Sequence, residues 1–180
     1  MIPSVEECFK FMEKYRMLGN IKAHSIMVEK VAHMIARGLR DAGVDVSLEK
    51  ITAGALMHDI GKTPSLDTGD DHEARGREIC LQNHLDEITG IVGEHVRLKN
   101  YRPDEAIKEK EIVYYADKRV NHDEVVTLEE RLKYLLRRYG KNQEHVVQSI
   151  KKNFTLCEEV ERKLFAKLKF KPEHLAEMIK

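Results

Sequence analysis

The sequence has few cysteines and prolines and no long apolar run. Its three cysteines, Cys8, Cys80 and Cys157, are widely spaced and form no Cys-x-x-Cys pair, which argues against a disulfide framework or a zinc ribbon. No apolar run approaches the roughly 20 residues of a membrane span. The N-terminal residues lack the basic-then-apolar order of a signal peptide. We therefore expect reduced thiols in a soluble, cytoplasmic protein with no membrane partner.

Neither sign of charge is in excess. Lysine and arginine together number 31, aspartate and glutamate together number 31, and the formal net charge is zero. A basic excess is typical of nucleic-acid binders, so we expect no stable nucleic-acid binding. A chain of 180 residues can bury about 70% of the surface that it exposes when unfolded. It needs no structural metal, so a bound metal would serve chemistry.

The hydrophobic periodicity predicts an all-α protein, because helical spacing recurs along the chain and strand-like alternation is scarce. Ser4 and Ser47 are expected N-caps, Gly140 is an expected helix end, and the polar stretch 63–71 is an expected loop. The expected helices cover residues 4–17, 22–40, 47–58, 72–83, 85–97, 104–120, 127–139, 142–168 and 172–180.

The residues that suit chemistry all fall between positions 24 and 117. We therefore divide the chain into a helical core over residues 1–122 and a helical C-terminal extension over 123–180. The extension is expected to pack on the core or to form a homodimer contact. Its apolar residues at helical spacing, between Leu128 and Phe154, are expected to face a core.

The most informative feature is the pair His58 and Asp59, which ends an apolar run and precedes Gly61, a residue suited to a turn. His24 upstream and Asp117 downstream complete an ordered pattern of two imidazoles and two carboxylates. Without a thiolate, the set is unlike a structural zinc site and suits a borderline divalent ion. Four ligands also leave positions open for water and substrate. One or two ions are expected, from among Mn, Fe, Co, Ni, Zn and Mg.

Two further histidines could hold a second ion. His72 stands at an expected helix start and His95 near an expected helix end, and Asp59 would bridge the two ions. A pair of ions about 3.5–4 Å apart can clamp the attacking and departing oxygens of a phosphate ester. The competing interpretation makes His72 a solvated residue and His95 a core histidine. The other histidines are expected to be structural or surface residues: His33, His84, His122, His145 and His174.

Lys62 follows the His-Asp segment and is a candidate catalytic cation that would bind a substrate phosphate. The alternative is a solvated loop lysine. Weaker candidates for the same role are Arg75, Arg97 and Arg119. Alternatives also remain for the ligands, since His58 and Asp59 could cap a helix and Asp117 could pair with Lys118 or Arg119.

With these residues the chain resembles the HD-domain superfamily of metal-dependent phosphohydrolases, in its HDIG subgroup, which the segment His58-Asp59-Ile60-Gly61 spells out. The resemblance covers roughly residues 20–122. It implies metal ligands at His24, His58, Asp59 and Asp117, with His72 and His95 at the positions of the second-metal histidines. It also implies a helical bundle and hydrolysis of a phosphomonoester or phosphodiester, such as a nucleotide. We expect Asp59 to orient the attacking water as well as to hold the metal, with Lys62 as the candidate catalytic cation.

The sequence departs from two branches of that superfamily. The segment 97–103 after His95 lacks the Gly-Tyr-Pro tripeptide of cyclic-dinucleotide phosphodiesterases, and no synthetase domain is attached. Two alternatives to a hydrolase stay open, namely a regulatory module that binds a nucleotide without hydrolysing it and a di-iron oxygenase.

Overall fold

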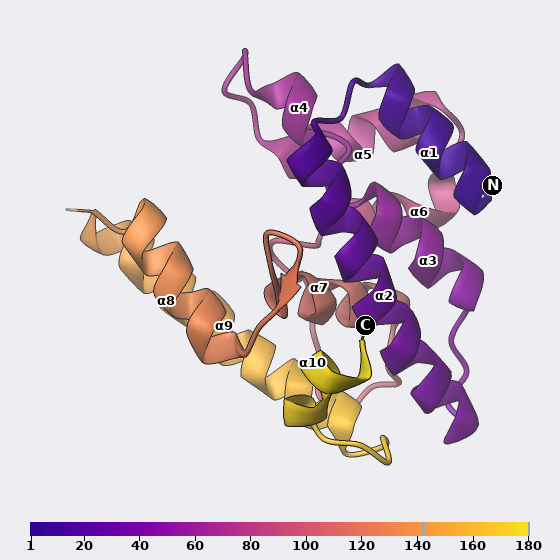
Figure 1. Ribbon diagram of the computed structural model, residues 1–180, viewed down its shortest axis with the longest axis vertical. Coiled ribbons are helices and arrows are strands. Elements are labelled where there is room, and N and C mark those ends of the chain that lie inside the picture. Colours follow the sequence, from indigo (N-terminus) through magenta and orange to yellow (C-terminus); the bar gives the residue numbers. More distant parts are fainter. Residues whose placement is uncertain (142, 180) are drawn as a thin grey trace.

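The chain folds into a helical body from which a long helical hairpin projects (Figure 1). The computed structural model describes residues 1–141 and 143–179. In this part of the chain the elements are α1 Val5–Lys14, α2 Gly19–Asp41, α3 Leu48–Met57, α4 Lys62–Ser65, α5 His72–Gln82, α6 Asp86–Val92, α7 Glu109–Lys118, β1 Val120–Asn121, β2 Glu124–Val125, α8 Leu128–Tyr139, α9 Glu144–Phe165, the 3₁₀ turn Pro172–His174 and α10 Leu175–Met178.

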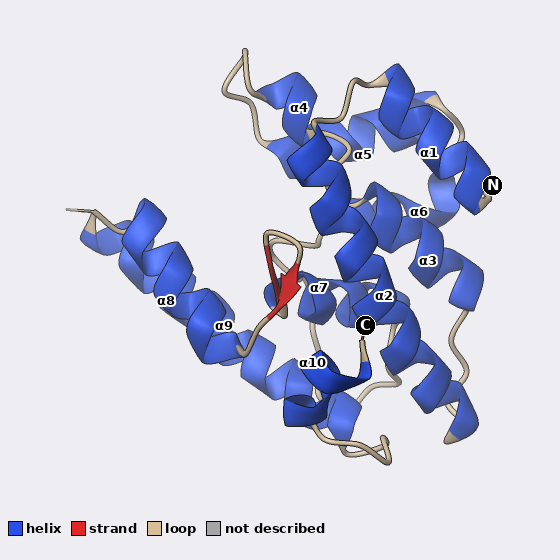
Figure 2. Ribbon diagram, viewed as in Figure 1, coloured by secondary structure: helices blue, strands red, loops and turns tan. Residues whose placement is uncertain are grey.

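The fold class is all-α, as predicted. The sheet found in the described residues is a two-stranded antiparallel ribbon in which Val120 pairs with Val125 (Figure 2). The sequence pattern did not indicate this ribbon, because two-residue strands are too short to show alternation. Among the described residues, none of the helices combines the length and apolarity that a membrane crossing requires.

The three helix caps predicted at Ser4, Ser47 and Gly140 are confirmed. The Ser4 hydroxyl accepts a hydrogen bond from the Glu7 amide, and the Glu7 carboxylate accepts one from the Ser4 amide, which is a capping box. The Ser47 hydroxyl accepts from the Lys50 amide at the start of α3. Gly140 is the C-cap of α8.

Other boundaries differ from the prediction. The helix expected over 85–97 ends at Val92, and the one expected over 104–120 begins at Glu109. The stretch 63–71 was expected to be a loop, but its first residues form part of α4. The expected helix 142–168 is α9, shorter at both ends, and position 142 lies outside the described residues. The end of the chain forms a 3₁₀ turn and a short helix instead of one helix.

Two hydrophobic clusters hold the body together, and α3 contributes to both. Ile51 and Ala55 pack in the cluster formed with α2, α7 and α9, whereas Leu56 and Met57 pack in the cluster formed with α1, α5 and α6. Each fully buried large side chain contributes about 1.5–3 kcal/mol. Because α3 is enclosed on both sides, the residues that follow its last turn lie deep inside the protein.

The hairpin of α8 and α9, referred to below as the α8–α9 hairpin, contacts the body chiefly through the second half of α9. Phe154, Cys157, Val160 and Leu164 of α9 are buried, whereas no residue of α8 is. The expectation that the apolar stripe beginning at Leu128 faces a core is therefore confirmed at Phe154. The stripe residues of α8 and of the first half of α9 are only half-buried, and Leu128 among them packs against the cluster formed with α2, α7 and α9. Those helices pack against each other and stand away from the body (Figure 1).

Candidate metal centre

The turn after α3 places His58 and Asp59 at the centre of the protein, where they are 0% and 2% exposed. Gly61 is required there for space rather than for an unusual backbone angle, since its φ is −78°. A Cβ atom at Gly61 would lie 2.2 Å from the His72 carbonyl oxygen and 2.5 Å from the Gly76 nitrogen. The turn therefore packs directly on the backbone of α5, which brings His72 to the site.

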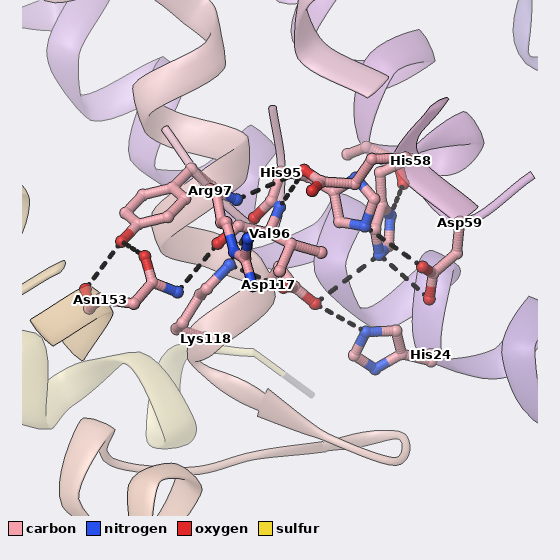
Figure 3. A network of polar contacts seen from close by, with 12 residues as sticks. His24, His58, Asp59, His95, Val96, Arg97, Asp117, Lys118 and Asn153 are labelled. Atoms are coloured by element: carbon pink, nitrogen blue, oxygen red, sulfur yellow. Dashed lines mark hydrogen bonds and ion pairs between the residues drawn. The ribbon is translucent and has the colours of Figure 1, made fainter. Parts of the chain in front are cut away.

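His24 on α2 meets Asp117 on α7. The His24 Nε2 atom lies 3.0 Å from Asp117 Oδ1, and its Nδ1 lies 2.8 Å from the His122 carbonyl oxygen in the β1–β2 turn. His122, expected to be structural or superficial, thus orients a site residue through its backbone. Figure 3 shows His24, His58, Asp59 and Asp117 turned toward one another.

The His58 ring is anchored at one nitrogen and free at the other. Its Nδ1 donates to the Ala55 carbonyl oxygen at 2.7 Å. Its buried Nε2 has no hydrogen-bond partner among the described residues, although Asp59 Oδ2 is 3.5 Å and Asp117 Oδ1 is 3.7 Å away. An unsatisfied buried nitrogen costs free energy, and a metal ion is the partner that such an imidazole suits.

His72 and His95 join Asp59 on its other side. The His95 Nε2 atom lies 3.3 Å and the His72 Nε2 atom 3.6 Å from Asp59 Oδ1, and the two Nε2 atoms are 3.2 Å apart. His95 lies in the turn after α6, with its Nδ1 bonded to the Val92 carbonyl oxygen at 2.7 Å. In both His58 and His95 the backbone bond to Nδ1 leaves the Nε2 lone pair for a ligand role.

The pKa values of His58, His72 and His95 are shifted in different directions. Burial lowers the pKa of His72 and of His95, so both are neutral at neutral pH. Burial also opposes a charge on His58, but the Asp59 and Asp117 carboxylates outweigh it and raise the pKa of His58. A neutral imidazole is the form that binds a metal.

Both carboxylates are ionised despite their burial. Burial opposes the charge of Asp59, but His58, His95 and Lys62 hold the pKa of its carboxyl well below the usual value. At Asp117 burial is likewise outweighed, chiefly by Lys118, and the pKa is held well below its usual value. Anionic oxygens are thus available to a cation.

These residues form two groups of potential ligands that share Asp59. His24, His58 and Asp59 make one group, and Asp59, His72 and His95 make the other, with all ligand atoms of a group within 4.8 Å of one another. Asp117 adjoins the first group through His24. The buried, unpaired His58 Nε2 and the nitrogen–oxygen donor set fit one or two divalent ions.

The basic residues predicted to bind a substrate phosphate do not all lie at the site. Lys62 reaches the site, where its Nζ donates to Asp59 Oδ2 at 2.9 Å while the side chain stays 41% exposed. Burial opposes its charge, but Asp59 outweighs burial and raises the pKa of Lys62. Lys118, foreseen only as an alternative partner of Asp117, donates to Asp117 Oδ2 at 3.1 Å and to the His95 carbonyl oxygen.

The three weaker arginine candidates have other partners. Arg75 pairs with Glu78 on the surface of α5. Arg119 is buried against Glu161 of α9, at 3.6 Å. Arg97 lines a separate cavity beside α9. None of the three lines the cavities next to the metal-binding groups.

Two residues that sequence reasoning missed hold the segment after His95. The Glu73 carboxylate accepts hydrogen bonds from the amides of Val96 and Arg97, at 2.9 and 3.3 Å. Asn153 on α9 donates to the Val96 carbonyl oxygen at 2.9 Å (Figure 3). No local pattern marks either residue, because their partners lie at least 23 positions away.

Two cavities open onto the potential ligands. One of about 460 Å³ is bordered by Asp59, His72, His95 and Asp117, and one of about 320 Å³ is bordered by His24 and Asp59. Residues of α8 line both. A larger cavity of about 670 Å³ lies between α2 and the C-terminal segment, but neither potential ligand group borders it, so we place the chemistry at the two smaller ones.

Comparisons with known proteins find relatives that share part of this sequence. An uncharacterized protein of Methanocaldococcus jannaschii is 27% identical over 154 residues, which cover 78% of this chain and 88% of that protein. The tRNA (cytidine(56)-2'-O)-methyltransferase of Picrophilus torridus is 31% identical over 84% of this chain, but over 45% of its own length. The same enzyme of Thermoplasma volcanium is 30% identical over 60% of this chain and 30% of its own length.

The chain thus spans less than half the length of the two methyltransferases that it matches. No solved structure matches it. The model of the HD domain matches residues 21–121, a range that contains the six clustered histidines and aspartates. The chain therefore belongs to the HD-domain family.

Proposed function

We propose that this protein is a metal-dependent phosphohydrolase that cleaves a small phosphomonoester or phosphodiester, a nucleotide or related molecule. The observation that carries the proposal is the pair of ligand groups sharing Asp59 beside two cavities. His24, His58 and Asp59 would hold one ion, and Asp59, His72 and His95 a second. A divalent ion bound there supplies Lewis acidity that activates water and polarises the phosphate.

The chain's own residues account for positioning and charge. Asp59 stays ionised, so it serves as a ligand and not as a proton donor. Lys62 stays an ammonium 2.9 Å from Asp59, where it would neutralise charge on phosphate oxygens in the transition state. In the reaction, the ester P–O bond is exchanged for a bond to the water oxygen, and the alcohol leaves with a proton.

The names of the relatives do not assign a further activity to this chain. Two relatives are tRNA methyltransferases more than twice as long as the segment they share with this chain. The six clustered residues of this chain would form a metal site, and phosphoester hydrolysis uses such a site directly. We therefore attribute hydrolysis, not methyl transfer, to this chain.

The test follows cleavage of a nucleotide panel by chromatography of the products, which detects hydrolysis of both phosphomonoesters and phosphodiesters. The protein is first stripped with a chelator and refilled with Mn²⁺, Co²⁺, Ni²⁺, Fe²⁺ or Mg²⁺ singly. We expect turnover of at least one phosphoester in a nucleotide panel, dependent on added metal, and its loss in Asp59→Asn. The exposed Asp104 supplies the matched control Asp104→Asn. No turnover with any metal would refute the proposal, and oxygen consumption by the iron form would favour the oxygenase alternative.

A further inference from the structure

The α8–α9 hairpin lies outside residues 21–121, which the HD model matches, and yet it forms the outer wall of both cavities beside the metal-binding groups. Arg131, Leu135 and Tyr139 of α8 line both cavities, together with Asp59 and Lys62 on the opposite side. The site is therefore incomplete without the hairpin.

Arg131 has capacity to bind an anion in this wall. Its Nη1 donates to Asn121 Oδ1 at 2.8 Å, which fixes the guanidinium beside the β1–β2 turn. Its Nε is buried and has no hydrogen-bond partner among the described residues. A buried donor without a partner is uncommon in proteins, and a planar guanidinium suits phosphate oxygens.

The charge of the two cavities also favours an anion. Of the described residues that line them, four are basic and two are acidic. The acidic ones, Asp59 and Asp117, belong to the metal-binding region, so bound divalent ions would increase the positive excess. The basic ones are Lys62, Lys118, Arg131 and Arg138.

Three exposed apolar side chains line the smaller cavity. Leu18, Leu66 and Tyr139 come from three separate segments, and they are 45%, 62% and 53% exposed. Large apolar side chains left exposed around a cavity typically mark a binding surface. An aromatic ring among them can stack on a flat ring of a ligand. We refer to these three residues as the apolar rim.

Resting on the phosphohydrolase function proposed above, we propose that the α8–α9 hairpin is the substrate-recognition wall of the site. Arg131 binds a phosphate oxygen of the substrate, and the apolar rim holds a flat ring carried by the same molecule. The substrate class is a small phosphate ester of a ring-bearing alcohol, such as a nucleoside monophosphate. Cavities of about 460 and 320 Å³ match the size of small-molecule sites.

The test measures binding, so that it does not depend on turnover. Calorimetric titrations of the full chain in excess Mn²⁺ would use inorganic phosphate and a nucleoside 5′-phosphonate, which has no ester bond to cleave. We expect Arg131→Gln to bind both ligands about 10- to 100-fold more weakly, and Arg131→Lys to fall between. The control is Arg137→Gln, since Arg137 is exposed on the same helix and lines neither cavity.

Removing the Tyr139 ring should affect the binding of the two ligands differently. Tyr139→Ala should weaken the nucleoside phosphonate about 5- to 100-fold, as the loss of base stacking does, and leave phosphate binding unchanged. The control is Leu81→Ala, which removes an exposed apolar side chain elsewhere. Equal metal content in all variants excludes loss of the metal site as the cause.

The outcomes separate this inference from the proposed function. Unchanged phosphate binding in Arg131→Gln, unchanged phosphonate binding in Tyr139→Ala, or no binding of either ligand by the unmodified chain would overturn the inference. Binding that follows the prediction in a protein that cleaves no phosphoester would overturn the proposed function and leave the recognition wall standing.

Discussion

Asp59→Asn is the sharpest perturbation of the metal centre, because Asp59 belongs to both ligand groups and is 2% exposed. Loss of a residue that merely supports a ligand costs about 10- to 100-fold in metal affinity. Asp59 is itself a ligand candidate for both ions, so we expect a loss of at least about 100-fold. The substitution keeps the volume of the side chain and removes one anionic oxygen.

The loss of affinity can be read as a thermal shift. A metal at 100 times its Kd stabilises the folded chain by about 2.7 kcal/mol, which raises Tm by about 5–11 °C in a chain of this size. At the same metal concentration, a variant with 100-fold weaker binding gains only about 0.4 kcal/mol, or about 1–2 °C.

The assay is differential scanning fluorimetry with and without metal, combined with elemental analysis of the dialysed protein. Comparing each variant with its own metal-free form cancels any effect of Asp59→Asn on the metal-free fold. Asp104→Asn should keep the full shift. A shift in Asp59→Asn as large as in the unmodified chain would refute the assignment of Asp59 as the shared ligand.

Three further perturbations test other parts of the site and the fold. His72→Ala should lower the bound metal from two ions to one by elemental analysis, whereas His33→Ala, whose ring contacts Thr52, should not change it. Lys118→Met removes one partner of a buried ion pair with Asp117 and should cost about 3–5 kcal/mol in urea unfolding; a cost below 1 kcal/mol would contradict the pairing. Burial raises the pKa of Cys8 and Cys80 to about 12 and also raises that of Cys157. All three thiols therefore stay protonated at pH 8. They should not react with a thiol reagent in the native state, and all three should react in urea.

Gly61 must be a glycine because of packing, and not because of its backbone angle. The sequence suggests that Gly61 serves a turn, but its φ of −78° is open to any residue. The requirement comes from α5, whose backbone lies 2.2 Å from where a Cβ would stand. This contact joins residues more than ten positions apart, so only the packed structure reveals it.

The sequence by itself determined the helical class and the set of potential ligand types. Helical periodicity and serine caps are local properties, and the order His24, His58, Asp59, Asp117 is a chemical pattern along the chain. These features depend on near neighbours or on residue identity, so they need no knowledge of packing.

Only the tertiary structure decided how those residues meet and what stands opposite them. His95 was expected at a helix end, but α6 stops at Val92 and Glu73 and Asn153 hold the following turn in place. The α8 stripe was expected to face a core, but none of its residues is fully buried, and Leu135 lines both cavities beside the potential ligand groups. Helical spacing shows that a helix has an apolar face. What that face meets depends on how distant segments pack, as where Asp59 and Arg131 line the same cavities from opposite sides, and no local pattern encodes this.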